Sequence, residues 1–181
     1  MVLSRYIPDA VVGDLDSIFS HVKDFYNEKG SEINKIVDDN STDFMKTISY
    51  INDRHGKDVV IIVFGGFGGR LDHAMHTLRI LNNEVHSHRS IMVSDECITF
   101  AIPKGTTQIM FSKDFDGPAC GLLPLAGPIT LSTQGLRWNL DNHPSSFEGL
   151  MSTSNIIDGP KVIVDTTNTL IWTSEFRPLK Q

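Results

Sequence analysis

Three short acidic segments of this chain carry side chains of the type that bind a divalent metal ion or a phosphate. They are residues 14–16 (Asp-Leu-Asp), residues 38–43 (Asp-Asp-Asn-Ser-Thr-Asp) and residues 70–72 (Arg-Leu-Asp). Each follows an apolar run and precedes a helical pattern, and ligands gather at the carboxyl ends of the strands in an open parallel sheet. We therefore expect the three segments to share one rim. Hard carboxylate oxygens there suit Mg²⁺, which takes one or two carboxylates together with substrate phosphates.

The glycine-rich stretch 65–69 ends another apolar run and precedes a further helical pattern. Its backbone N–H groups can approach a phosphate closely ahead of a helix N-terminus, and Arg70 can pair with a phosphate oxygen. A second interpretation is purely structural. Asp16, Thr42 and Asp72 are of types preferred as helix caps, and the glycines match neither the dinucleotide pattern nor the Walker pattern. Spacing alone leaves both interpretations open.

The first half of the chain alternates strand and helix patterns. Apolar runs at 10–12, 33–37, 59–64 and 91–93 predict strands, and apolar residues at helical spacing within 18–26, 44–51 and 74–81 predict helices. Thr42 is the expected N-cap of the second helix and Gly56 its stop. The six-residue run at 59–64 is typical of a strand buried on both faces. The alternation predicts a parallel sheet with covering helices.

The second half has a different pattern. From residue 98 onward, β-prone runs at 98–102, 108–111, 129–131, 161–165 and 169–173 are separated by Gly, Pro, Asn and Asp. This predicts an antiparallel β-sandwich or jelly-roll. The expected fold is therefore a parallel, Rossmann-like α/β domain, residues 1–97, followed by a β-sandwich domain, residues 98–181.

Composition limits the partners of the chain. A net charge of -6 over 181 residues, with no stripe of Lys and Arg, is unfavourable for binding nucleic acid. No apolar stretch approaches the ~18–20 residues of a membrane span, and no apolar run like that of a signal peptide follows the first residues. The two cysteines are expected to be reduced core thiols, which fits a cytoplasmic location.

Six motifs, taken in order, resemble the thiamine pyrophosphokinase family of the eukaryotic type. They are GDLDS at 13–17, DDNSTDF at 38–44, GGFGGRLDH at 65–73, CGLLP at 120–124, GLRWNL at 135–140 and STSN at 152–155. Each motif alone is weak, but together they cover nearly the whole chain. Two departures are Asp39, where the family usually has Gln, and Asn40, where it often has Asp.

The resemblance implies an α/β catalytic domain followed by a β-sandwich, in a homodimer with active sites at the subunit interface. It implies transfer of a pyrophosphoryl group from ATP to the hydroxyl of thiamine, with Mg²⁺, giving thiamine diphosphate and AMP. Such a transfer needs positioning and charge neutralisation more than a protein nucleophile. By motif, the metal-binding and catalytic residues would be Asp14, Asp16, Asp43 and Asp72. The phosphate-binding residues would be Thr42, Gly68, Gly69 and Arg70, and the thiamine-binding residues Ser132, Trp138, Ser152, Ser154 and Asn155.

Members of the family begin with a strand, a helix and a Gly-rich segment before the GDLDS-like motif, which here starts at residue 13. We therefore expect the first βα portion to be absent, which would expose a strand edge and remove part of the nucleotide site. The alternative function is a truncated relative that keeps thiamine binding or dimerisation without turnover. Asp-x-Asp after a strand is also the signature of aspartate-nucleophile phosphatases. Ser17 stands where those enzymes usually carry Thr or Val, however, and they do not explain the C-terminal motifs.

One aromatic residue in the second half can serve either the core or a ligand. Trp138 lies in a Gly-bounded stretch beside Arg137 and Asn139. A tryptophan in a β-domain is usually core, but an indole face also stacks on a flat cationic ring such as that of thiamine. We expect Trp138 to be partly exposed, in a pocket that faces the partner subunit.

Overall fold

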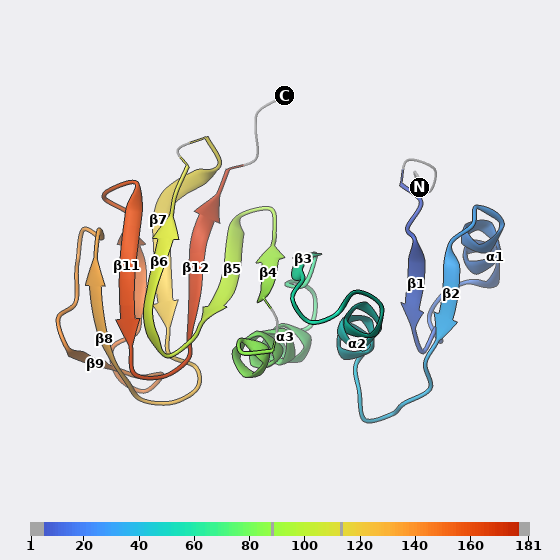
Figure 1. The fold of residues 1–181 in the computed structure, drawn as a ribbon, viewed down its shortest axis with the longest axis horizontal. Coiled ribbons are helices and arrows are strands. Elements are labelled where there is room, and N and C mark those ends of the chain that lie inside the picture. The colour runs from blue at the N-terminus through green and yellow to red at the C-terminus, as the bar shows by residue number, and fades with distance from the viewer. Residues whose placement is uncertain (1–5, 88, 113, 178–181) are drawn as a thin grey trace. The chain divides into compact units, whose positions relative to one another are not determined.

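Figure 1 shows the chain as a computed structural model, which describes residues 6–87, 89–112 and 114–177. The backbone forms two compact units, one ending at Lys57 and the other beginning at Asp58. Each unit has its own secondary structure and its own packing. Within the described ranges, no helix has the length and apolar character needed to cross a membrane.

The first unit alternates strands and helices. Its elements are β1 (Ala10–Gly13), α1 (Ser20–Glu28), β2 (Glu32–Lys35) and α2 (Asp43–His55). Strands β1 and β2 pair in parallel, with Val11 opposite Ile33, and α2 packs against β1. The predicted order of strands and helices is confirmed for this part of the chain.

Helix α2 begins and ends where its sequence predicts. The hydroxyl oxygen of Thr42 accepts a hydrogen bond from the backbone N–H of Met45 at 3.4 Å. This bond satisfies one of the N–H groups that the first turn of a helix leaves without a partner. Gly56 ends the helix with a φ of 78°, which glycine adopts without a Cβ clash.

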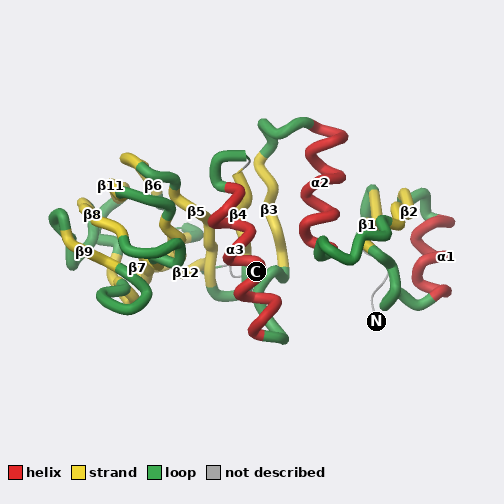
Figure 2. The backbone as a smooth tube through the Cα atoms, turned by 90° about the horizontal axis from the view of Figure 1, so that it is seen from below, coloured by secondary structure: helices red, strands yellow, loops and turns green. Residues whose placement is uncertain are grey.

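The second unit begins with a parallel pair of strands joined by a helix. Strands β3 (Val60–Phe64) and β4 (Arg89–Val93) pair in parallel, and α3 (Leu71–Glu84) connects them. The strands that follow are β5 (Cys97–Ile102), β6 (Gly105–Met110), β7 (Asp116–Leu123), β8 (Ile129–Gln134), β9 (His143–Ser145), β10 (Ser152–Ile156), β11 (Lys161–Thr166) and β12 (Leu170–Phe176). Figures 1 and 2 show α3 against the sheet, where it contacts β5 and β12.

Two sheets make up the rest of this unit. Strand β4 pairs antiparallel with β5, so β3 and β4 extend a six-stranded sheet with the order β10-β7-β12-β5-β4-β3. The second sheet has the order β6-β11-β8-β9, and Figure 2 shows it as a layer beside the first. Side chains from both sheets fill the core, among them Ile102, Leu122, Val162, Val164 and Trp172. The predicted β-sandwich is confirmed.

The prediction that the apolar run 59–64 is buried on both faces is wrong. Strand β3 is an edge strand, and within the described ranges it pairs only with β4. Val60, Ile62 and Phe64 are 47%, 57% and 77% exposed, whereas Ile61 is 7% exposed. Alternate residues of a strand point to opposite faces, so one face of β3 is buried and the other is an apolar face that the described elements of the second unit do not cover.

Candidate functional site

The acidic segment after β1 lies against the start of α2. The backbone N–H of Asp14 donates to Oδ1 of Asp43 at 3.0 Å. The backbone N–H of Asp16 donates to Oδ1 of Asp14 at 3.1 Å, and this bond is the main cause that lowers the pKa of Asp14. Gly13 permits the close approach, because a Cβ at this position would lie 2.9 Å from the carboxyl carbon of Asp43. The carboxylates of Asp14 and Asp43 therefore belong to one local group.

Lys46, a residue outside the predicted site, completes this group. Its Nζ lies 3.6 Å from Oδ2 of Asp14 and 3.4 Å from Oδ1 of Asp43. The lysine side chain is 3% exposed, whereas the two carboxylate side chains are 43% and 54% exposed. A buried ammonium needs such partners, because an unpaired buried charge is costly. The signal in the sequence is a lysine three residues after Asp43, where helical side chains are neighbours.

A further carboxylate orders the loop before α2. Oδ2 of Asp38 accepts from the hydroxyl of Ser41 at 2.6 Å, and Oδ1 accepts from the backbone N–H of Asn40 at 2.9 Å. The Ser41 hydroxyl is the largest cause that lowers the pKa of Asp38, followed by the Asn40 N–H, and the positive charge of Lys46 acts in the same direction. The field of the buried ammonium thus reaches this loop as well.

The capping interpretation holds for Thr42 and fails for Asp16. Helix α1 begins after Phe19, which makes no side-chain capping bond, and Asp16 lies earlier in the loop. Leu15 has a φ of 58°, a conformation uncommon outside glycine that turns the chain between the two aspartates. Asp72 is also no cap, because Arg70 holds the N-cap position of α3.

The residues of the first unit fit a magnesium ion that is shared with phosphates. Within the described ranges, no group of three or more His, Cys, Asp or Glu side chains could hold a metal ion by itself. Asp14 and Asp43 supply the one or two carboxylates that Mg²⁺ takes when phosphates and water complete its shell. Both carboxylates are about half exposed, so a ligand can reach them from solvent.

The third acidic segment belongs to the second unit. The guanidinium of Arg70 donates to both oxygens of Asp72, at 2.6 and 3.1 Å, and it lowers the pKa of that carboxyl. Beside this pair, a Cβ at Gly68 or Gly69 would meet no atom within 4 Å, so the glycine loop is open. That Asp72 shares a rim with the acidic residues of the first unit stays a prediction.

Trp138 is 58% exposed, so it is not sealed in the sandwich core; that it lies in a pocket facing a partner subunit stays a prediction. Asn155, which is 3% exposed, holds its backbone from two sides. Oδ1 of Asn155 accepts from the N–H of Trp138 at 3.3 Å, and Nδ2 donates to the carbonyl of Trp138 at 2.9 Å. Nδ2 also donates to Oγ of Ser152 at 3.2 Å. Three of the predicted thiamine-binding residues therefore form one hydrogen-bonded cluster.

The other two predicted thiamine-binding residues lie in different surroundings. Ser132 is on β8, where its Oγ accepts from the backbone N–H of Asn142 at 2.9 Å. Ser154 lies where the pairing of β10 with β7 shifts register, and its φ is 56°. Such bulges re-aim side chains and are frequent beside active sites. Here the bulge turns Thr153 and Ser154 toward a cavity.

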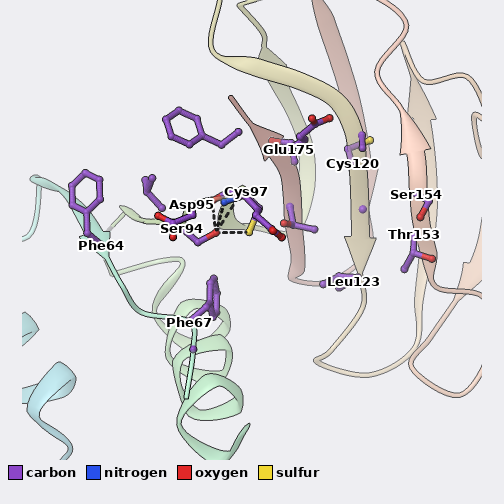
Figure 3. Close-up of a pocket in the computed structure, with 18 of the residues that line it drawn as sticks. Phe64, Phe67, Ser94, Asp95, Cys97, Cys120, Leu123, Thr153, Ser154 and Glu175 are labelled. Atoms are coloured by element: carbon purple, nitrogen blue, oxygen red, sulfur yellow. Dashed lines mark hydrogen bonds between the residues drawn. The ribbon is translucent and has the colours of Figure 1, made fainter. Parts of the chain in front are cut away.

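This cavity, of about 1050 Å³, lies within the second unit (Figure 3). Thr153 and Ser154 come from β10 on one side, and Phe64 and Phe67 come from β3 and the loop after it on the other. Gly68 of the glycine loop also lines it. The cavity therefore brings together a residue predicted for phosphate binding and one predicted for thiamine binding.

Both cysteines line the same cavity as unpaired thiols. Sγ of Cys97 lies 3.2 Å from Oγ of Ser94 (Figure 3), so the partly exposed thiol has a polar partner. Cys120 is buried, and burial raises the pKa of its thiol to about 12. The prediction of core thiols therefore holds for Cys120, whereas Cys97 is only partly buried.

Comparisons with known proteins match both halves of the chain. Residues 2–93 match the family model of the thiamin pyrophosphokinase catalytic domain, and residues 106–171 match that of the thiamin pyrophosphokinase vitamin B1 binding domain. Thiamine pyrophosphokinase 1 of Oryza sativa subsp. japonica is 38% identical over 97% of this chain and 69% of its own length. Thiamine pyrophosphokinase 1 of Arabidopsis thaliana is 35% identical over 95% of this chain and 67% of its own length.

Two solved structures with a similar fold are also thiamin pyrophosphokinases. Thiamin pyrophosphokinase from Candida albicans superposes with a TM-score of 0.86 at 26% identity, over 95% of this chain and 74% of that one. The yeast enzyme gives a TM-score of 0.85 at 25% identity, over 96% and 71% of the two chains. The chain is an α/β and β-sandwich protein, and it belongs to the thiamine pyrophosphokinase family.

Proposed function

We propose that this chain transfers the diphosphate of ATP to the hydroxyl of thiamine, giving thiamine diphosphate and AMP. The observation that carries the proposal is the successive match of the catalytic and vitamin B1 binding family models, at residues 2–93 and 106–171. In the reaction, the hydroxyl oxygen of thiamine bonds to the β-phosphorus of ATP. The bond from that phosphorus to the oxygen bridging it to the α-phosphorus breaks, AMP leaves with that oxygen, and the hydroxyl proton is released to solvent.

The acidic residues would hold the metal and the phosphates. They are Asp14, Asp16, Asp43 and Asp72. Mg²⁺, when bound, neutralises phosphate charge and stabilises the transition state. The two half-exposed carboxylates over a buried lysine support this role, because phosphoryl-type transfer depends on positioning and on charge neutralisation.

Phosphate contacts are proposed for the two helix starts. Thr42 and Arg70 hold the N-cap positions of α2 and α3, and helix N-termini favour negative charge. Gly68 and Gly69 lie in the open loop before α3, where their backbone N–H groups could contact phosphate oxygens. Binding phosphate through Arg70 requires the guanidinium to share or leave its pairing with Asp72.

The exposed indole of Trp138 is proposed to stack on the cationic ring system of thiamine, with Ser132, Ser152, Ser154 and Asn155 nearby. The guanidinium of Arg137 lies 5.8 Å from the indole centroid, a separation at which a cation is attracted to an aromatic face, and this supports the proposal. Asn155 has its amide engaged with the backbone of Trp138. Its proposed contribution is therefore to fix the position of the indole.

The assembly and location of the chain are proposals of the same kind. We propose a homodimer, supported by the large exposed fraction of Trp138. A functional division into residues 1–97 and 98–181 follows the order of the two family models. A cytoplasmic location is supported by the unpaired cysteines.

The test is incubation with ATP, Mg²⁺ and thiamine, with AMP and thiamine diphosphate measured separately. Equal amounts of the two products support the proposal. If the carboxylate of Asp16 binds the metal, Asp16→Asn should lower the rate by about 100-fold or more. Thiamine binding by calorimetry without formation of AMP would replace the proposal with a binding-only function. Absence of both products and of thiamine binding would refute it.

A further inference from the structure

The buried lysine of the first unit has a feature that metal binding alone does not explain. The ammonium of Lys46 lies within 3.6 Å of Asp14 and 3.4 Å of Asp43. These are the two carboxylates that fit a magnesium ion. A cation held at this distance repels a second cation at the same carboxylates, since two positive charges a few ångströms apart interact unfavourably even near a protein surface.

The local charge count shows the consequence. The three groups in direct contact, Asp14, Asp43 and Lys46, together carry one net negative charge, so a free divalent cation bound to these three alone would leave them with one net positive charge. When the metal arrives bound to phosphates, the negative charge of the phosphates offsets this excess positive charge. Without the ammonium, the two carboxylates would neutralise a free divalent cation by themselves, and a phosphate chain would then be disfavoured.

We propose that Lys46 makes this site selective for a divalent cation that is already bound to a polyphosphate, by repelling the free cation and attracting its phosphate complex. The identity of the phosphate as ATP rests on the proposed function. Lys46 is thus a specificity-determining residue for the charge of the incoming complex. Its burial keeps the ammonium in place, because the side chain is 3% exposed and has little freedom to turn to solvent.

The test compares binding of Mn²⁺ alone with binding of Mn²⁺ and α,β-methylene-ATP, an analogue that cannot release AMP. Free Mn²⁺ is followed by electron paramagnetic resonance and the nucleotide complex by calorimetry. Lys46→Met keeps an unbranched side chain, one heavy atom shorter, and removes its charge. Lys46→Arg keeps the charge, and Lys23→Met removes a lysine charge from exposed positions of α1 in the same unit.

We expect Lys46→Met to bind Mn²⁺ alone about fivefold more tightly and the nucleotide complex at least about tenfold more weakly. Lys46→Arg, like the unmodified chain, should bind the nucleotide complex more tightly than Mn²⁺ alone. Lys23→Met should change both affinities by less than about twofold. Equal or weaker binding of free Mn²⁺ by Lys46→Met, or undiminished binding of the complex, overturns the proposal.

A measurement on the unmodified chain keeps the proposal testable if Lys46→Met does not fold. The unmodified chain must bind the nucleotide complex at least about tenfold more tightly than Mn²⁺ alone. Comparable affinities for the two would overturn the proposal without any variant. Neither measurement uses thiamine, so a chain that passes them and still forms no thiamine diphosphate refutes the proposed reaction and not the role of Lys46.

Discussion

Replacing Asn155 with alanine should loosen the exposed indole and destabilise the unit that carries it. The amide of Asn155 makes four hydrogen bonds: two with the backbone of Trp138, one with Oγ of Ser152 and one with the N–H of Ile156. Alanine makes none of these bonds. The side chain is 3% exposed, so the substitution also leaves a small internal space.

The magnitude follows from these bonds. A neutral hydrogen bond contributes about 1 kcal/mol net, and an unsatisfied buried partner costs more. Because the Trp138 side chain is 58% exposed, water can reach part of the freed backbone and reduce the penalty. We expect a loss of about 2–3 kcal/mol in the free energy of unfolding. For a chain of this size this corresponds to a fall of about 5–10 °C in the melting temperature.

Tryptophan fluorescence during urea unfolding is the appropriate assay. The chain has two tryptophans, and both lie in the second unit, where Trp172 is 0% exposed. In a Trp138→Phe background the emission of Trp172 reports the sandwich core alone. Thr153→Ala is the matched control, because Thr153 is an exposed neighbour on the same strand. If Asn155→Ala unfolds within about 0.5 kcal/mol of this control, Asn155 does not anchor the backbone of residue 138 as we infer.

Four further results are expected. Gly13→Ala should lower stability by about 1 kcal/mol or more and reduce activity, because its φ of 155° and the carboxylate 2.9 Å away leave no room for a Cβ; normal values of both would contradict the geometry of this turn. Asp16→Asn should keep the melting temperature within about 2 °C while activity falls, since this residue caps no helix; a large fall in stability would restore a structural role. Ile62→Lys should reduce concentration-dependent association measured by light scattering, because β3 exposes an apolar face; unchanged association would show that the chains do not associate through that face. A thiol reagent at pH 8 should modify Cys97 in the folded chain and Cys120 only after unfolding, because burial raises the pKa of the latter to about 12; equal rates for both would show that Cys120 is accessible.

Features that depend on neighbouring residues in the chain could be predicted from the sequence, whereas features that depend on distant partners could not. Helix α2 has its N-cap and its glycine stop within its own sequence, and both are as predicted. The prediction for β3 had the correct position and the wrong burial, because burial depends on which layer covers each face. Strand β7 was not predicted, since Gly117 and Pro118 disfavour a strand. It forms because β12 and β10 pair with it from both sides.

The candidate site divides in the same way. The pairing of Asp14 with the start of α2 was expected from the acidic segments, because both lie at strand–helix junctions. The buried position of Lys46 could not be read from composition, since a lysine on a helix is usually solvated. The bonds from Asn155 to Trp138 join residues that are 17 apart in the sequence. Local patterns do not encode such a pair.

The continuity of the six-stranded sheet limits how this protein can be divided or recombined. Strand β4 pairs in parallel with β3 and antiparallel with β5, so one ladder of hydrogen bonds joins the region matched by the catalytic family model to strands of the sandwich. A fragment that starts at residue 98 would leave the remaining part of β5 with an unsatisfied edge, and such edges recruit other chains. Cleavage after Lys57 interrupts no strand pairing within the described ranges. A transplantable thiamine-binding cassette should therefore begin near residue 58 and carry β3, α3 and β4 with it, and exchange of modules between relatives is expected to keep these elements with the sandwich.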